Sequence, residues 1–167
     1  ERHCGRTFWR STATTRTFHA DSYSGVRVDD IATAAGLVVA TDDDADGVFE
    51  QTWTVSTDFA LEPVNALADG RPATQVVAVG DLRFPVAAAR ASVQVTAIFG
   101  WPAVPDEVRE ATLIKAARLF RRKDTPEGVA GGGDFGVVRI SRWEDPDVVM
   151  LLAPFVRPGD AIGWGIG

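Results

Sequence analysis

The chain has 167 residues, 46% of them hydrophobic and 24% charged, with a formal net charge of −6 at pH 7. This composition is ordinary for a globular chain with a real core, and the acidic balance argues against generic binding of nucleic-acid phosphates. The single cysteine, Cys4, excludes an internal disulfide framework and a cysteine-rich zinc site. No apolar run is long enough to span a bilayer, so we expect no membrane partner.

Residues 1–11, which begin ERHCGRTFWR, are expected to end an N-terminal helical region. Gly5 follows the first four residues, and glycine readily takes the left-handed conformation in which helices often end.

Residues 12–99 are predicted to form an antiparallel β-rich domain. Short β-branched or aromatic segments alternate with turn residues; these segments are TTRTFHA, GVRVDDI, GLVVATD, GVFEQTWTV, TQVVAVG and ASVQVTAIF. In the last of them the side chains alternate, so one face is expected to carry Val93, Val95, Ala97 and Phe99. Such alternation is typical of a half-buried antiparallel strand.

The stretch TDDDADGVFEQTW, residues 41–53, raises the question of a metal site, because Asp42-x-Asp44-x-Asp46-Gly47 is the first half of a calcium-binding EF-hand loop. The twelfth position of such a loop needs a bidentate carboxylate, and here it is Trp53. Glu50 falls at the ninth position, and both flanks have the composition of strands. We therefore predict the turn of a β-hairpin and no metal site, with a weak calcium site as the alternative.

Residues 100–157 carry two predicted helices. A long helix is expected at 104–123, with Pro105 in the first turn, acidic residues at its start and basic residues at its end. Val108 and Phe120 belong to its broad apolar face, and Trp101 precedes it; these three are predicted core residues. A second, shorter helix is expected at 146–156, with Asp145 as its N-cap and Pro146 in its first position.

The fold class predicted from these patterns is α+β. The N-terminal helix end and the two later helices are expected to form a small helical core, with the antiparallel β domain inserted between them. Residues 158–167 form an apolar tail that is expected to dock on another surface.

The motif census predicts no enzyme and no cofactor. The chain contains neither a G-x-S-x-G nucleophile elbow nor a P-loop. The segment GVAGGGDFG lacks the Lys-Ser/Thr continuation of a phosphate-binding loop, so we interpret it as a connector.

Three stretches resemble the head-tail connector, or head-to-tail adaptor, proteins of tailed bacteriophages, in the version found in siphophages of actinobacteria. ERHCGRTF is similar to the end of the first helical region of that family. FGWPAVPDEVREATLIKAARLFRRKDTPEGVAG and RISRWEDPDVVMLLAPFVRP are similar to its long helix and its C-terminal part. The stretch between them looks like the β-rich insertion of these versions, and the resemblance implies a helix upstream of Glu1.

The resemblance implies a structural role without catalysis. Family members form a ring, typically of twelve copies, between the portal and the stopper or tail-terminator protein in the neck of the virion. The ring is assembled in the host cytoplasm and extends the channel through which genomic DNA passes without specific binding. An acidic chain suits such a channel, since a basic lining would hold the phosphates.

Two sets of residues are expected to serve these contacts. Lys115, Arg118 and Arg122 are predicted to pair with acidic groups of neighbouring subunits, with a solvated helix face as the alternative. Ile162, Trp164 and Ile166 of the apolar tail are predicted to dock on the portal. The alternative functions are another neck ring protein, such as a stopper or tail terminator, and a β-rich module that binds calcium or carbohydrate.

Overall fold

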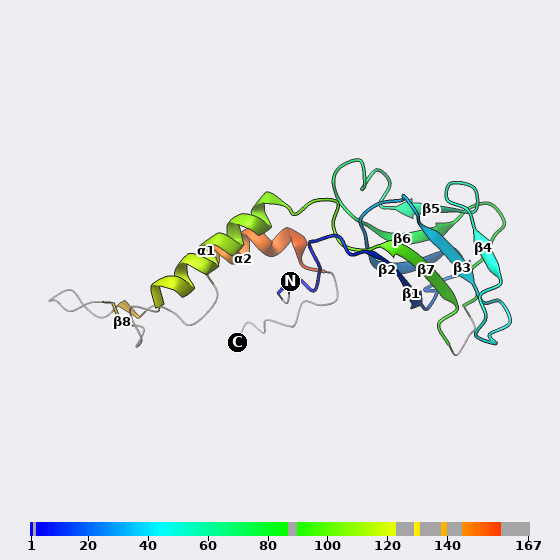
Figure 1. Cartoon of the computed structure of the whole chain (residues 1–167), viewed down its shortest axis with the longest axis horizontal. Coiled ribbons are helices and arrows are strands. Elements are labelled where there is room, and N and C mark those ends of the chain that lie inside the picture. Colours follow the sequence, from blue (N-terminus) through cyan, green and yellow to red (C-terminus); the bar gives the residue numbers. More distant parts are fainter. Residues whose placement is uncertain (2, 87–89, 123–128, 131–137, 140–144, 158–167) are drawn as a thin grey trace. The chain divides into compact units, whose positions relative to one another are not determined.

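The computed structural model describes residues 1, 3–86, 90–122, 129–130, 138–139 and 145–157 (Figure 1). The chain divides into two compact units. We call residues Thr7–Ala103 the β unit, and we call Glu1–Arg6 together with Val104–Gly167 the helical unit.

The β unit contains two antiparallel sheets among its described residues. The first has the strand order β1-β7-β3-β4, formed by Ala13–Phe18, Val93–Ile98, Val38–Thr41 and Gln51–Trp53. The second has the order β2-β6-β5, formed by Gly25–Ile31, Ala73–Ala78 and Phe59–Glu62. Neighbouring strands run antiparallel throughout both sheets, as the sequence predicted.

One hydrophobic cluster draws on both sheets. It includes Val26 and Phe59 from the second sheet and Val39 and Val95 from the first, all of them fully buried. The predicted alternation along β7 is confirmed, because the four residues of its expected inner face are at most 3% exposed. Each fully buried large apolar side chain contributes roughly 1.5–3 kcal/mol, so this cluster dominates the stability of the β unit.

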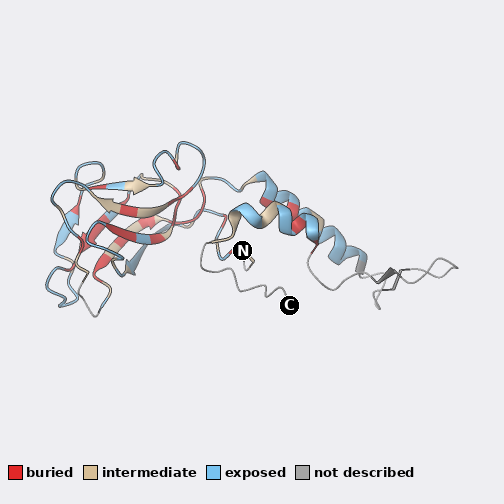
Figure 2. Ribbon diagram, turned by 180° about the vertical axis from the view of Figure 1, so that it is seen from behind, coloured by how far each residue is buried: buried red, intermediate tan, exposed pale blue. Residues whose placement is uncertain are grey.

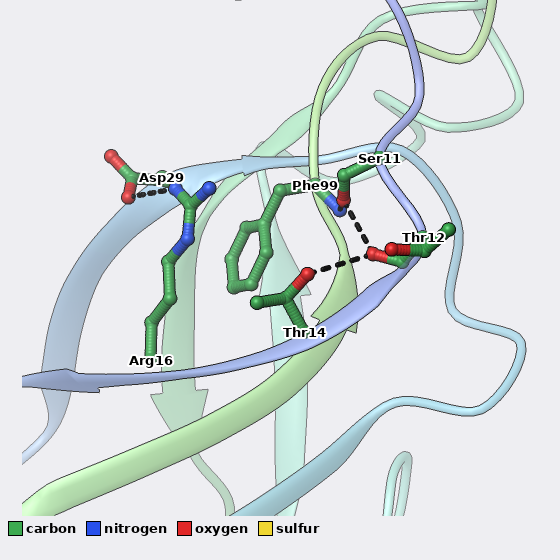
Figure 3. Close-up of polar contacts among 6 residues, drawn as sticks. All are labelled: Ser11, Thr12, Thr14, Arg16, Asp29 and Phe99. Carbon is green, nitrogen blue, oxygen red and sulfur yellow. Dashed lines mark hydrogen bonds and ion pairs between the residues drawn. The ribbon is translucent and has the colours of Figure 1, made fainter.

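Strand β1 lies at the edge of the first sheet and is held there by polar contacts (Figure 3). The backbone N–H of Ser11 donates to the carbonyl of Phe99 (2.7 Å), and the N–H of Phe99 donates to Ser11 Oγ (2.9 Å). Arg16 forms an ion pair with Asp29 (2.6 Å), and its guanidinium lies 4.2 Å from the centre of the Phe99 ring. These contacts fix a threonine-rich strand whose side chains are mostly exposed.

The helical unit contains α1 (Asp106–Arg122), the two-residue strands β8 (Val129–Ala130) and β9 (Val138–Arg139), α2 (Pro146–Leu152) and the 3₁₀ turn η1 (Ala153–Phe155). Both helices lie within the ranges that the sequence predicted. At the N-terminal side of this unit, Arg157 donates its backbone N–H to the carbonyl of Cys4 (3.0 Å).

The predicted helical core with an inserted β domain is wrong. The described chain is mostly β. Seven strands form the two antiparallel sheets of the β unit, and the helical unit has only two short helices and the two-residue strands β8 and β9. Few helix residues are buried, namely Val108, Ala111 and Val148, whereas fourteen residues form the buried cluster of the β unit. Helical periodicity in the sequence reports which residues share a face, but it does not report what covers that face.

Candidate functional site

Helix α1 presents two apolar sides. Val108 and Ala111 are buried, as is Val148 of α2, the helix against which α1 packs. Figure 2 shows that the rest of the α1 surface is largely exposed. The burial by α2 therefore accounts for only one side of the apolar pattern in this helix.

The second apolar side is a stripe of four exposed residues, which we call the α1 stripe: Leu113, Ala116, Ala117 and Phe120. Leu113 is 59% exposed and Phe120 is 72% exposed. Residues spaced by three and four share one side of a helix, and at about 100° per residue this side faces away from Val108 and Ala111. An exposed apolar stripe of this kind is a candidate contact surface for another protein.

Asp145 connects the two helices through separate oxygens of one buried carboxylate. Its Oδ1 accepts from the backbone N–H of Asp147 (3.0 Å), which confirms the predicted N-cap of α2. Its Oδ2 lies 2.6 Å from the guanidinium of Arg118 on α1, and the Asp145 side chain is only 6% exposed. The sequence predicted the cap, but nothing in the sequence places Arg118 beside it.

The three predicted inter-subunit residues have different surroundings. Lys115 is exposed on α1. Arg118 is 54% exposed and pairs with Asp145 of its own chain, so its charge already has a partner before any subunit contact forms. The side chain of Arg122 lies outside the described residues, as do Ile162, Trp164 and Ile166.

Two of the three predicted core residues are buried, and one prediction is wrong. Trp101 is 7% exposed, its ring centre lies 5.5 Å from that of Phe8, and its Nε1 donates to Asp30 (3.2 Å). Val108 is buried at the start of α1. Phe120 is exposed instead, because its position in the helical turn places it on the α1 stripe and away from α2.

Titratable groups in the described part of the chain offer one candidate for metal binding. Asp42, Asp44 and Glu50 each bring a carboxylate oxygen within 4.8 Å of the others. The buried thiol of Cys4 is a poor nucleophile, because desolvation raises its pKa above the ordinary value.

Comparison of the chain with protein-family models, with curated proteins and with solved structures returns no match. None of the helices in the described ranges combines the length and the hydropathy needed to cross a membrane.

Proposed function

We propose that this chain is a structural protein of a phage virion, a head-to-tail adaptor that forms a ring between the portal and the stopper or tail. The α1 stripe is the observation that carries this proposal. A helix whose opposite sides are both apolar has one side for its own unit and one for a second polypeptide. The long-helix segment resembles that of phage adaptors, which assemble as rings of identical copies. We therefore take the second polypeptide to be another copy of this chain.

In a ring, the α1 stripe of every subunit can be covered by a neighbouring subunit. In a closed ring each copy meets its two neighbours through different surfaces, so an apolar side of α1 is covered when the ring closes. Lys115 is exposed on the other side of α1, four residues after Ala111, where it is available to a carboxylate of the second neighbour in the ring. Exposed ion pairs of this type contribute at most about 1 kcal/mol, so the apolar contact supplies most of the energy.

The remaining contacts follow the same proposal. The apolar residues Ile162, Trp164 and Ile166 dock on the portal, and the opposite end of the ring receives the stopper or tail-terminator protein. The net charge of −6 favours a channel along which DNA slides without being held. Neither catalysis nor a cofactor is part of this role, and the place of action is the neck of the virion.

Light scattering on a size-exclusion column tests the assembly. The chain is run alone and then with the portal protein encoded nearby in its genome. The proposal predicts co-elution with a mass gain of about one chain per portal subunit. Failure to associate, with any natural N-terminal residues present, would contradict the adaptor role and would favour a ring lower in the neck.

A matched pair of variants tests the stripe itself. Phe120→Asp places a charge on the most exposed large residue of the α1 stripe and is expected to abolish the mass gain, since burying an unpaired charge costs several kcal/mol. Val64→Asp is the control, because Val64 of the β unit is 71% exposed, close to the 72% of Phe120. Equal loss of association in both variants would contradict a specific role for α1.

A further inference from the structure

The loop of residues 42–50 joins two paired strands. β3 and β4 form an antiparallel pair in which Val39 lies opposite Trp53 and Thr41 lies opposite Gln51. The predicted hairpin is therefore confirmed. The loop begins at Asp42, whose backbone N–H donates to the carbonyl of Ser92 (3.0 Å), the residue directly before β7. The first residue of the loop is therefore fixed to the first sheet.

Asp42 carries a buried carboxylate with one oxygen unused. The residue is only 1% exposed. Its Oδ2 accepts from the backbone N–H of Gly47 (2.9 Å), whereas its Oδ1 is buried without a hydrogen-bond partner. A buried carboxylate oxygen without a partner is costly, so in native proteins it usually has a ligand, a donor or an ion.

Two further carboxylates meet this buried group. One oxygen each of Asp42, Asp44 and Glu50 lies within 4.8 Å of the others. Two oxygens on opposite sides of a calcium ion are separated by about 4.6–5.2 Å, given bond lengths of roughly 2.3–2.6 Å. The cluster therefore has the dimensions of a calcium shell, and the mutual repulsion of its carboxylates is offset when a cation lies between them.

We propose that the 42–50 hairpin loop is a calcium-binding site, with Asp42, Asp44 and Glu50 as its carboxylate ligands. Asp42 and Asp44 hold the first and third positions of a calcium loop, and Gly47 provides the sharp turn at the sixth, where its φ is +98°. Val48 holds the seventh position, at which such loops use a backbone carbonyl.

In our proposal Glu50 provides the carboxylate that the glutamate at position twelve provides in an EF-hand loop. In an EF-hand the chain leaves the loop into a helix, and a glutamate at position twelve closes the shell. In this hairpin the chain turns back at once into β4, so the ninth residue already lies beside the first. The requirement for a carboxylate at position twelve, where Trp53 stands, belongs to a loop between two helices, whereas this loop joins two paired strands.

The expected ion is calcium rather than magnesium. Carboxylates and backbone carbonyls on an exposed loop suit the large and irregular shell of Ca²⁺, whereas Mg²⁺ demands a near-ideal octahedron and retains its waters. With three carboxylates on a loop, a dissociation constant of about 0.1–1 mM is expected. Arg90 donates to the carbonyl of Asp46 (3.3 Å), and its positive charge limits the affinity.

Calorimetric titration of the chelator-treated full chain with CaCl₂ tests the site. Glu50→Gln and Asp44→Asn change exposed side chains, so both variants are expected to fold and to lose at least about tenfold in calcium affinity. Asp43→Asn is the matched control, because Asp43 is an exposed neighbour outside the cluster and carries the same charge. It is expected to keep its affinity within about threefold, and Arg90→Gln is expected to bind more tightly.

Thermal melting provides a second readout. About 10 mM CaCl₂ is expected to raise the Tm of the natural chain by a few degrees and to leave that of Glu50→Gln unchanged. The proposal is overturned if the natural chain shows no heat of calcium binding and no Tm shift with CaCl₂. If Asp43→Asn weakened calcium binding as much as Glu50→Gln does, the affinity would depend only on the overall negative charge of the loop, and the named ligands would be wrong. If MgCl₂ bound as tightly as CaCl₂, the assignment to calcium would be wrong.

Discussion

The two units of this chain use their apolar residues in opposite ways. In the β unit, Phe59 is fully buried within a cluster drawn from two sheets. In the helical unit, Phe120 is 72% exposed on α1, a helix with few buried residues. The same residue type therefore stabilises the fold of one unit and, in our proposal, the assembly of the other.

Alanine substitution of Phe59 and of Phe120 tests this difference between the two units most strongly. Phe59→Ala leaves a cavity in the core and is expected to lower the free energy of unfolding by about 3–5 kcal/mol. Phe120→Ala is expected to change it by less than about 0.5 kcal/mol in the isolated chain, since an exposed side chain contributes little. Urea unfolding monitored by circular dichroism measures both values, and similar losses would contradict the comparison.

Substitution of Gly100, which follows β7, tests whether the close approach of the backbone of Trp9 matters for the stability of the β unit. Its φ is +114°, and a Cβ at this position would overlap with the backbone carbonyl of Trp9. Because backbone has to move to relieve this overlap, Gly100→Ala is expected to lower the free energy of unfolding by about 3 kcal/mol or more.

Gly70→Ala is the control for the backbone conformation of Gly100. Gly70 also has a positive φ, +72°, but no atom lies within 4 Å of a Cβ there. Its substitution is expected to cost about 1 kcal/mol, the cost of the left-handed conformation alone. Equal losses of stability for the two glycines would show that the approach of Trp9 is unimportant.

Asp145 tests the internal stability of the helical unit. Asp145→Ala removes the N-cap of α2 and the partner of Arg118, and it is expected to lower the free energy of unfolding of this unit by about 1–2 kcal/mol. Helicity followed at 222 nm during urea unfolding measures the change. Asp147→Ala, an exposed first-turn carboxylate, is the control and is expected to cost about 0.5 kcal/mol.

The smallest expected effect concerns Asp21 of the β unit. Arg27 donates to Asp21 through its guanidinium (2.8 Å) and its backbone N–H, and the side-chain hydrogen bond is the main cause that lowers the pKa of Asp21 below its ordinary value of 3.8. Because the pKa of Asp21 is lower in the folded chain, the pair stabilises the fold at pH values above the ordinary pKa of 3.8. This contribution disappears as the pH falls through the pKa of Asp21 in the folded chain. The effect is small because the Arg27 side chain is 79% exposed.

Urea midpoints of Asp21→Asn and of the natural chain measure this linkage. The variant is expected to be less stable near neutral pH, and the difference is expected to shrink in acid. A difference that stays constant across this range would show that the carboxylate charge is not responsible.

Local patterns in the sequence predicted local structure well and tertiary surroundings poorly. The alternation at Val93 and Val95 and the capping residue Asp145 are properties of neighbouring residues, and both predictions are confirmed. The exposure of Phe120 and the approach of Glu50 to Asp42 depend on which surfaces meet in the fold. Periodicity does not contain that information, so Phe120 was misplaced, and the carboxylates of the 42–50 loop were recognised from their spacing only as an alternative, weak calcium site.

Electron cryo-microscopy of the chain bound to its portal tests the central claim most directly. The account predicts a ring of copies in which Leu113 and Phe120 of each α1 are buried against the neighbouring copy. A ring in which the α1 stripe faces solvent, or a portal that carries no copies of the chain, would contradict it.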